Sequence, residues 1–325
     1  MSFISKAVGL PSFLFSVFVF YWSLPIFALT YRIRFASKGK RNDMLEWAKA
    51  LVRFFGVKVL TQGEHSLYRG GPCLYLCNHR SWADFFIDAY LTEGRAALMS
   101  RWLVYFVFPI FCTSVMVLRG IVLFKRGTIA DKEAFNAWLD AKMKSSTIPG
   151  LLVYPEGHRS LKRTSLPLKR GMLHFAFSRG LPVQLVMCAG KEEVLSEKRM
   201  AVRFGRTLVA TYSEVLKPGN YPTFDAFFSG IQTAWDSCWQ AAYKQPPEGA
   251  APLPMVNTTE YDYPPRMRRL QLIVTLLSIV VLAAVLAGSV LVTVVAAAAV
   301  GPMPAGVVVA VLASWLGGSM LRSFL

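Results

Sequence analysis

The stretch "LCNHRSWADFF" (residues 76–86) places a histidine and an aspartate five positions apart, directly after a short apolar run. On one continuous helix, five positions rotate by roughly 500°, so the two side chains would point about 140° apart. They can meet only if His79 lies in a turn before the helix and Asp84 reaches back from its first turn. Ser81-x-x-Asp84 fits a capping box with Asp in place of Glu, which predicts a helix starting at Ser81. The pair is therefore compatible with a helix cap, with a catalytic dyad, or with both.

Short apolar runs bounded by Gly, Pro or Asn, and separated by helical patterns, indicate buried strands of an α/β domain. These runs are "CLYLCN" (73–78), "GIVLFK" (120–125), "GLLVYP" (150–155) and "LPVQLVM" (181–187). The longer apolar stretch 101–118 contains Pro109 and lies inside this pattern, so it predicts buried or membrane-surface helices rather than a membrane span. We expect one domain over residues 42–243, with its strands in a central sheet.

The composition is that of a membrane protein with a basic surface. The chain has 325 residues, of which 54% are hydrophobic and 17% charged, with a mean hydropathy of +0.40 and a net charge of +17. Such a charge suits nucleic acid, or an anionic bilayer and phosphorylated substrates. Because the sequence has no zinc-finger spacing or RNA-binding aromatic pattern, we expect a lipid bilayer and no nucleic acid as partner. The five scattered cysteines predict free thiols in a reducing compartment, and we expect no metal site.

The amino-terminal segment, residues 1–41, contains a charge-free and aromatic-rich run of membrane-spanning length at residues 10–31. Five basic residues follow between positions 32 and 41, which places that side in the cytosol by the positive-inside rule. Pro11 and Pro25 leave open a bent, partly inserted helix in place of a straight span.

The carboxyl-terminal segment predicts a transmembrane hairpin. Residues 244–265 are rich in proline and small residues and are typical of a linker. Residues 266–325 contain two apolar segments, 270–295 and 305–325, rich in Val, Ala and Gly as packed membrane helices often are. Arginines before the first segment and Arg322 in the second indicate that both ends of the hairpin lie on the cytosolic side.

Basic residues near strand ends and helix starts predict an anion site. In "VYPEGHRS" (153–160), Glu156-Gly157 allows close backbone approach to a ligand and Arg159 offers a planar fork suited to phosphate. Two further basic pairs are Lys125-Arg126, after an apolar run, and Lys169-Arg170, before a predicted helix start. Each pair alone is more often a solvated surface charge, but their shared placement favours one anion-binding region.

Four blocks of the sequence resemble, in order and rough spacing, the motifs of the glycerolipid acyltransferases typified by 1-acylglycerol-3-phosphate acyltransferase. The blocks are "NHRSWAD" (78–84), "GIVLFKR" (120–126), "YPEGHRS" (154–160) and "LPVQLV" (181–186), within roughly residues 65–215. The resemblance implies an α/β fold: an acyltransferase domain with a central mixed sheet flanked by helices, with membrane helices at the amino and carboxyl termini.

The resemblance also implies a reaction. His79 would be the general base, Asp84 would orient it, and acyl-CoA would be a co-substrate with no further cofactor. The acceptor would be lysophosphatidic acid and the product phosphatidic acid, at the cytosolic face of the endoplasmic reticulum. The acceptor phosphate would be held by Arg126, Glu156, Gly157, Arg159, Lys169 and Arg170, with Glu156 orienting the basic residues. The sequence has no G-x-S-x-G elbow, so we expect no acyl-enzyme.

The sequence departs from the family pattern at several positions. Tyr154 replaces a phenylalanine, which we expect to be harmless, and His158 replaces a threonine beside the expected phosphate site. Leu185 stands where the fourth block often has a second proline, and Lys125 where an acidic residue is frequent. These changes leave open another lysophospholipid or glycerol 3-phosphate as acceptor. A catalytically silent lipid-binding or membrane-shaping protein is the alternative from a different class.

Overall fold

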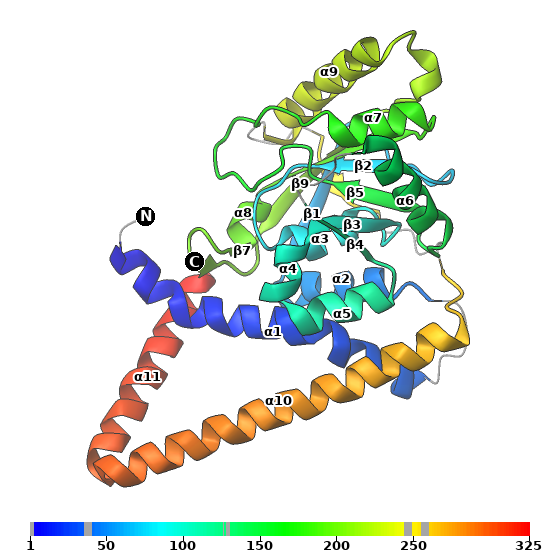
Figure 1. The fold of residues 1–325 in the computed structure, drawn as a ribbon. Coiled ribbons are helices and arrows are strands. Elements are labelled where there is room, and N and C mark those ends of the chain that lie inside the picture. Colours follow the sequence, from blue (N-terminus) through cyan, green and yellow to red (C-terminus); the bar gives the residue numbers. More distant parts are fainter. Residues whose placement is uncertain (1–2, 36–40, 126, 128–130, 244–248, 255–259) are drawn as a thin grey trace.

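The structure is a computed structural model that describes residues 3–35, 41–125, 127, 131–243, 249–254 and 260–325. Its centre is an eight-stranded sheet in the order β10-β1-β9-β6-β2-β5-β3-β4 (Figure 1). The strands are β1 (Lys58–Gln62), β2 (Leu74–Cys77), β3 (Ala96–Arg101), β4 (Ile121–Phe124), β5 (Gly150–Val153), β6 (Val183–Ala189), β9 (Thr207–Tyr212) and β10 (Ala251–Pro252). A separate two-stranded sheet pairs β7 (Leu195–Ser196) with β8 (Ala201–Val202).

The sheet is mixed, as the sequence predicts. The five strands β6, β2, β5, β3 and β4 run parallel, whereas β9 is antiparallel to β6 and β10 is antiparallel to β1. All four predicted strands are present as β2, β4, β5 and β6. Every residue of β2, β5 and β6 is buried, because helices cover both faces of the central sheet.

Helices flank the sheet on both sides (Figure 1). One side carries α6 (Lys132–Lys144), α7 (Gly171–Ser178) and α9 (Phe224–Tyr243), and the other carries α2 (Asp43–Phe54), α3 (Asp84–Leu91), α4 (Trp102–Val107) and α5 (Pro109–Val117). The single turn α8 (Lys191–Val194) and the 3₁₀ turn η1 (Pro218–Asn220) complete the domain. The apolar stretch 101–118 thus forms two short helices that begin at Trp102 and Pro109, as predicted, rather than a span.

Parts of the segment predicted to be a linker, residues 244–265, pair with the domain. Residues 251–252 pair with β1, and the backbones of Arg41 and Tyr261 exchange hydrogen bonds of 2.9 and 2.8 Å. Tyr261 and Tyr263 are buried, so their rings anchor this segment in spite of its proline content. Residues 244–248 and 255–259 lie outside the described residues.

Among the described residues, three helices are long and apolar enough to cross a membrane: α1 (Phe3–Phe35), α10 (Pro265–Val300) and α11 (Pro302–Ser323). Helices α10 and α11 form the predicted hairpin and meet at Gly301, whose φ of +88° is a conformation that glycine adopts without a steric penalty. Figure 1 shows α11 returning from this turn toward the amino-terminal end of α1. Most side chains of the hairpin are exposed, whereas α1 buries one face.

Candidate active site

The loop that carries His79 leaves the carboxyl end of β2, the edge of a parallel sheet at which α/β proteins commonly bind ligands. Asn78 fixes the start of this loop against the neighbouring strand β6. Its side-chain amide donates to the carbonyl of Cys188 at 2.8 Å and its amide oxygen accepts from the Cys188 N–H at 3.1 Å. The next residue, His79, is therefore held at the rim of the sheet with 21% of its side chain exposed.

His79 and Asp84 meet as the spacing requires. The imidazole Nδ1 lies 2.7 Å from Asp84 Oδ2, and Asp84 is the first residue of α3. The same carboxylate oxygen accepts the backbone N–H groups of Arg80 at 2.7 Å and Ser81 at 3.1 Å. Three donors therefore fix one oxygen of Asp84, and its hydrogen bond with Nδ1 leaves the histidine Nε2 as the nitrogen that can accept a proton.

The predicted capping box forms only in half, because α3 begins later than expected. Asp84 does reach back to the Ser81 N–H, but the cap position is Ala83, which has no side-chain cap bond. The Ser81 hydroxyl instead donates to the carbonyl of Lys191 at 2.9 Å and accepts from the Ala83 N–H at 3.2 Å. Ser81 thus joins the His79 loop to α8, and residues 81–83 form a turn that brings Asp84 under the imidazole.

A buried network lies behind the dyad. The Lys191 ammonium donates to both oxygens of Asp88 at 2.7 and 2.8 Å and lies 3.5 Å from Asp84 Oδ1. The hydroxyl of Tyr154 donates to Asp88 Oδ2 at 3.0 Å, and its ring stacks on the His79 ring at 4.0 Å. The Tyr154 hydroxyl, which a phenylalanine would lack, thus adds a third hydrogen bond to a fully buried carboxylate.

The electrostatics of the site follow from burial and from one lysine. Burial lowers the pKa of His79, which outweighs the opposing effect of Asp84, so the ring is neutral near pH 7. Burial alone would raise the pKa of Asp84, but Lys191 and the hydrogen bond with His79 hold that pKa below its ordinary value. For Lys191 burial acts in the opposite direction and would lower the pKa, yet Asp84 and Asp88 raise that pKa above its ordinary value. A neutral base therefore faces an ionised carboxylate.

Glu156 binds backbone amides with both of its carboxylate oxygens. Its side chain is fully buried, and burial raises its pKa. Its two oxygens accept the backbone N–H groups of His79 at 2.8 Å and Leu166 at 3.0 Å. Glu156 thus ties the loop after β5 to the histidine loop, and Gly157 beside it has a φ of +77°, where glycine is favoured.

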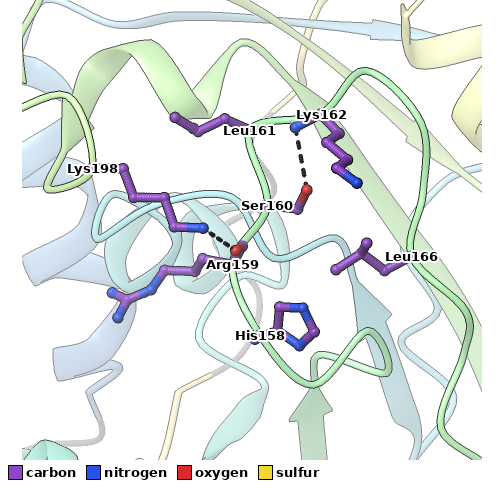
Figure 2. Close-up of a pocket in the computed structure, with 7 residues that line it drawn as sticks. All are labelled: His158, Arg159, Ser160, Leu161, Lys162, Leu166 and Lys198. Atoms are coloured by element: carbon purple, nitrogen blue, oxygen red, sulfur yellow. Dashed lines mark hydrogen bonds between the residues drawn. The ribbon is translucent and has the colours of Figure 1, made fainter.

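A hollow of about 480 Å³ opens next to the histidine loop, on the segment that follows Gly157 (Figure 2). It is lined by His158, Arg159, Ser160, Leu161, Lys162, Leu166 and Lys198. The Ser160 N–H donates to the carbonyl of His79 at 3.0 Å, which joins the hollow to the dyad. In Figure 2 the ring of His158 and the guanidinium of Arg159 point in different directions from the backbone. Three basic side chains therefore surround a space beside the candidate base.

Of the described residues predicted to bind phosphate, Arg159 alone lines this hollow. Its Nε lies 3.0 Å from Glu197 Oε1, while the other oxygen of Glu197 accepts the Trp82 N–H at 3.2 Å. Arg170 precedes α7 as expected, but it forms an ion pair with Asp225 and stacks on aromatic rings of α9.

The remaining predicted basic residues are placed as follows. The N–H of Lys169 donates to the Pro155 carbonyl at 2.8 Å, and its side chain is exposed. Arg126 lies outside the described residues.

Several residues at the site were not predicted from the sequence. Lys191 and Asp88 have no motif of their own, although Lys191 follows the end of a predicted strand, the same signal that drew attention to Lys125. Lys162 and Lys198 belong to the exposed basic residues that a sequence alone does not assign to a site. Within the described ranges, no group of three or more His, Cys, Asp or Glu side chains is placed to hold a metal ion. All five cysteines are buried and unpaired.

Comparison with known proteins gives a consistent result. Residues 58–189 match the family model Acyltransferase. Over 153 residues, the chain is 24% identical to a 1-acyl-sn-glycerol-3-phosphate acyltransferase of Cocos nucifera, covering 47% of this chain and 48% of that one. It is 24% identical over 170 residues to the protein of the same name from Haemophilus influenzae, covering 51% of this chain and 68% of that one. The chain thus spans about half of the first relative and two thirds of the second.

The fold is also found in a solved structure. It is the 1-acyl-sn-glycerophosphate (LPA) acyltransferase PlsC from Thermotoga maritima, with a TM-score of 0.54 and 14% identity, covering 74% of this chain and 98% of that one. At this identity the likeness concerns the fold alone. The match over residues 58–189 and the named relatives show that this part of the chain is similar to glycerolipid acyltransferases.

Proposed function

We propose that this protein is an acyl-CoA-dependent O-acyltransferase that acylates the glycerol hydroxyl of lysophosphatidic acid to give phosphatidic acid. The observation that carries the proposal is the 2.7 Å contact between His79 Nδ1 and Asp84 Oδ2 at a partly exposed histidine. A glycerol hydroxyl is a weak nucleophile that needs a base close by, and a neutral imidazole with a free nitrogen is such a base.

The proposed reaction is a direct transfer. His79 Nε2 takes the proton of the acceptor hydroxyl while its oxygen attacks the thioester carbonyl of acyl-CoA. The carbon–sulfur bond then breaks, and the imidazolium returns the proton to the departing thiolate. Asp84 stabilises the imidazolium formed in between, and it is itself kept ionised by Lys191. The five cysteines, all buried, are poorly placed to act as nucleophiles.

The hollow beside the dyad is the proposed place of the acceptor phosphate. Arg159, Lys162 and Lys198 line it, and a dianionic phosphate would be attracted by three cations. The Ser160–His79 backbone bond sets the hollow next to the base, which suits an acceptor whose hydroxyl lies a few bonds from its phosphate.

The proposed location is a membrane facing the cytosol, such as that of the endoplasmic reticulum. The apolar helices support membrane attachment, and a bilayer is where an acyl-chain acceptor and a two-chain product partition. The arginines in the first turns of α10 support a cytosolic catalytic domain.

A direct assay tests the function. Purified protein in lipid vesicles, given labelled acyl-CoA, is expected to transfer label to lysophosphatidic acid in preference to lysophosphatidylcholine and glycerol 3-phosphate. Preferred transfer to one of the latter two would retain the reaction and replace the acceptor. Absence of transfer to every acceptor, with the lipids still bound, would instead support the catalytically silent lipid-binding alternative.

The phosphate site has its own test. Replacing Arg159 with alanine is expected to raise KM for lysophosphatidic acid by about 10- to 100-fold, the loss of a charge-assisted hydrogen bond, with a smaller effect on kcat. Lys217→Ala, an exposed lysine outside the hollow, is the matched control. An unchanged KM for the Arg159 variant would move the phosphate site elsewhere.

A further inference from the structure

Over residues 4–20, helix α1 has two distinct faces. The buried face comprises Gly9, Ser12, Phe13, Ser16 and Phe20, and the exposed face comprises Ile4, Val8, Leu14, Phe15 and Phe18. At 100° per residue these two sets lie on opposite sides of the helix. This part of α1 is therefore covered by protein on one side and presents aliphatic and aromatic side chains on the other, whereas no residue of 19–27 is exposed.

The buried face of α1 is part of the catalytic domain. The ring of Phe20 is fully buried and lies 4.9 Å from Phe111 of α5 and 6.4 Å from Phe86 of α3. Nearer the amino terminus, Phe13 stacks at 5.9 Å on Trp82 of the histidine loop. The middle of α1 thus lies against the domain, at the level of α3 and α5, and cannot also lie at the centre of a bilayer that the domain does not enter.

The amino-terminal part of α1 is bound to the last turns of α11. The Ser12 N–H donates to Ser319 Oγ at 3.0 Å, and the two serine hydroxyls lie 2.8 Å apart. Arg322 donates to the Ser5 hydroxyl at 2.8 Å. These last turns of α11 are themselves attached to the domain, because the Phe204 N–H donates to the Ser323 carbonyl at 2.8 Å.

The carboxyl-terminal half of α1 meets the first turns of α10 in the same way. Leu24 and Pro25 of α1 line one small cavity together with Gln271 and Thr275 of α10. Gln271 also donates to the buried Asp43 of α2 at 3.0 Å. Both parts of α1 therefore contact those ends of the hairpin that lie next to the domain (Figure 1).

The hairpin is long enough to cross a bilayer. Residues 279–300 of α10 extend for roughly 33 Å at 1.5 Å per residue, and none of them is buried. Helix α11 extends for roughly 33 Å over its 22 residues, and its last turns are the ones that pack on α1. A hydrocarbon core of about 30 Å therefore fits between the turn at Gly301 and the level of α1 if the last turns of α11 lie in the near leaflet together with α1.

We propose that α1 does not cross the membrane but lies along its surface, with its exposed face in the acyl region of the near leaflet. The α10–α11 hairpin would then be the membrane-crossing part of the described chain, and the amino terminus would lie on the same side as the catalytic domain. The exposed face of α1 lies between the ends of α10 and α11 that are next to the domain. Away from the domain, both of these helices are apolar and exposed, as membrane-crossing helices are. We therefore assign a lipid leaflet as the partner of the exposed face. This assignment is independent of the acceptor lipid.

Cysteine cross-linking in membranes tests the placement. In the variant Ser12→Cys/Ser319→Cys, a mild oxidant is expected to form a disulfide, because the two hydroxyl oxygens are 2.8 Å apart. The matched control is Ser12→Cys/Val307→Cys, whose second position lies near the hairpin turn and is expected not to cross-link. If α1 crossed the bilayer with its amino terminus on the far side, Ser12 would lie near that turn. Cross-linking to position 307, or none to position 319, would overturn the proposal.

Labelling of single cysteines in sealed vesicles provides a second measurement. The native cysteines are all buried, so a membrane-impermeant maleimide should report on the introduced thiol. Lys6→Cys, at a partly exposed position off the lipid-facing side of α1, and the exposed domain control His65→Cys are expected to react from the same side. Met303→Cys, at an exposed position of the hairpin turn, is expected to react from the opposite side. Reaction of Lys6→Cys from the side that labels Met303→Cys would show that α1 crosses the bilayer.

Discussion

Replacing His79 with alanine is expected to lower kcat/KM for acyl transfer by about 10²- to 10⁴-fold, the usual contribution of a general base. The imidazole is the partly exposed member of the dyad, and its Nδ1 bond to Asp84 leaves Nε2 for the acceptor hydroxyl. Alanine removes the base but keeps the backbone N–H that donates to Glu156, so the loop should stay in place. Labelled acyl-CoA and lysophosphatidic acid in vesicles give the measurement.

Two further variants separate loss of the base from loss of the fold. His65→Ala removes an exposed histidine outside the site and should retain full activity and an unchanged melting temperature. Asp84→Asn should also lower kcat, because the amide neither stabilises the imidazolium nor selects the same tautomer. Near-normal turnover of the His79 variant would refute the general-base assignment, and a lowered melting temperature would attribute the loss to folding.

Local patterns in the sequence were sufficient to predict the strands and the dyad. Runs such as residues 73–78 and 150–155 are apolar on both faces, which in a chain of this length indicates central strands of a covered sheet. The five-residue spacing of His79 and Asp84 was informative because only a turn before a helix brings the two together. Both inferences rest on residues close in sequence, where geometry is set by the local backbone.

The features that the sequence did not predict depend on contacts between residues far apart in the chain, or on helix faces of similar hydropathy. Lys191 lies 103 residues from Asp88, so no local spacing connects them. We expected Glu156 to orient basic residues; its buried oxygens accept the N–H groups of His79 and Leu166, and no local sequence pattern marks the contact with His79, 77 residues away. In α1 both faces are apolar, and hydropathy cannot tell a side chain packed on the domain from one that faces lipid.

Replacing Lys191 with methionine is expected to destabilise the protein by about 3–5 kcal/mol, the cost of removing one partner from a buried ion pair. The ammonium is fully buried and is bonded to both oxygens of Asp88, with Asp84 Oδ1 3.5 Å away. Methionine fills a similar volume, so the loss is of charge rather than of packing. Thermal unfolding in detergent gives the measurement. Lys198→Met, at an exposed lysine, should change stability by no more than about 0.5 kcal/mol.

The pH dependence of stability shows whether the loss in the Lys191 variant is caused by charge. In the parent protein the depressed pKa of Asp84 contributes stability that is present above about pH 4, the pKa of an unfolded aspartate, and is lost as pH falls through the lower folded pKa. In the parent, burial already raises the pKa of Asp88 to about 7, although Lys191 opposes it. Without Lys191, burial raises the pKa of Asp84 above the unfolded value and raises that of Asp88 further. Their contribution is then greatest in acid and falls as pH rises, so the stability difference from the parent should widen between pH 5 and 8.

If Lys191→Met does not fold, a double variant tests whether the unpaired buried charges are the cause. Lys191→Met/Asp88→Asn removes one buried carboxylate together with the ammonium, and should recover part of the lost stability because one unpaired charge is gone.

Tyr154→Phe removes only the hydroxyl that donates to Asp88 and keeps the ring stacked on His79, so it should lower the free energy of unfolding by about 1 kcal/mol. A Lys191 variant as stable as the parent at every pH would mean that the network does not compensate the charge of Asp84.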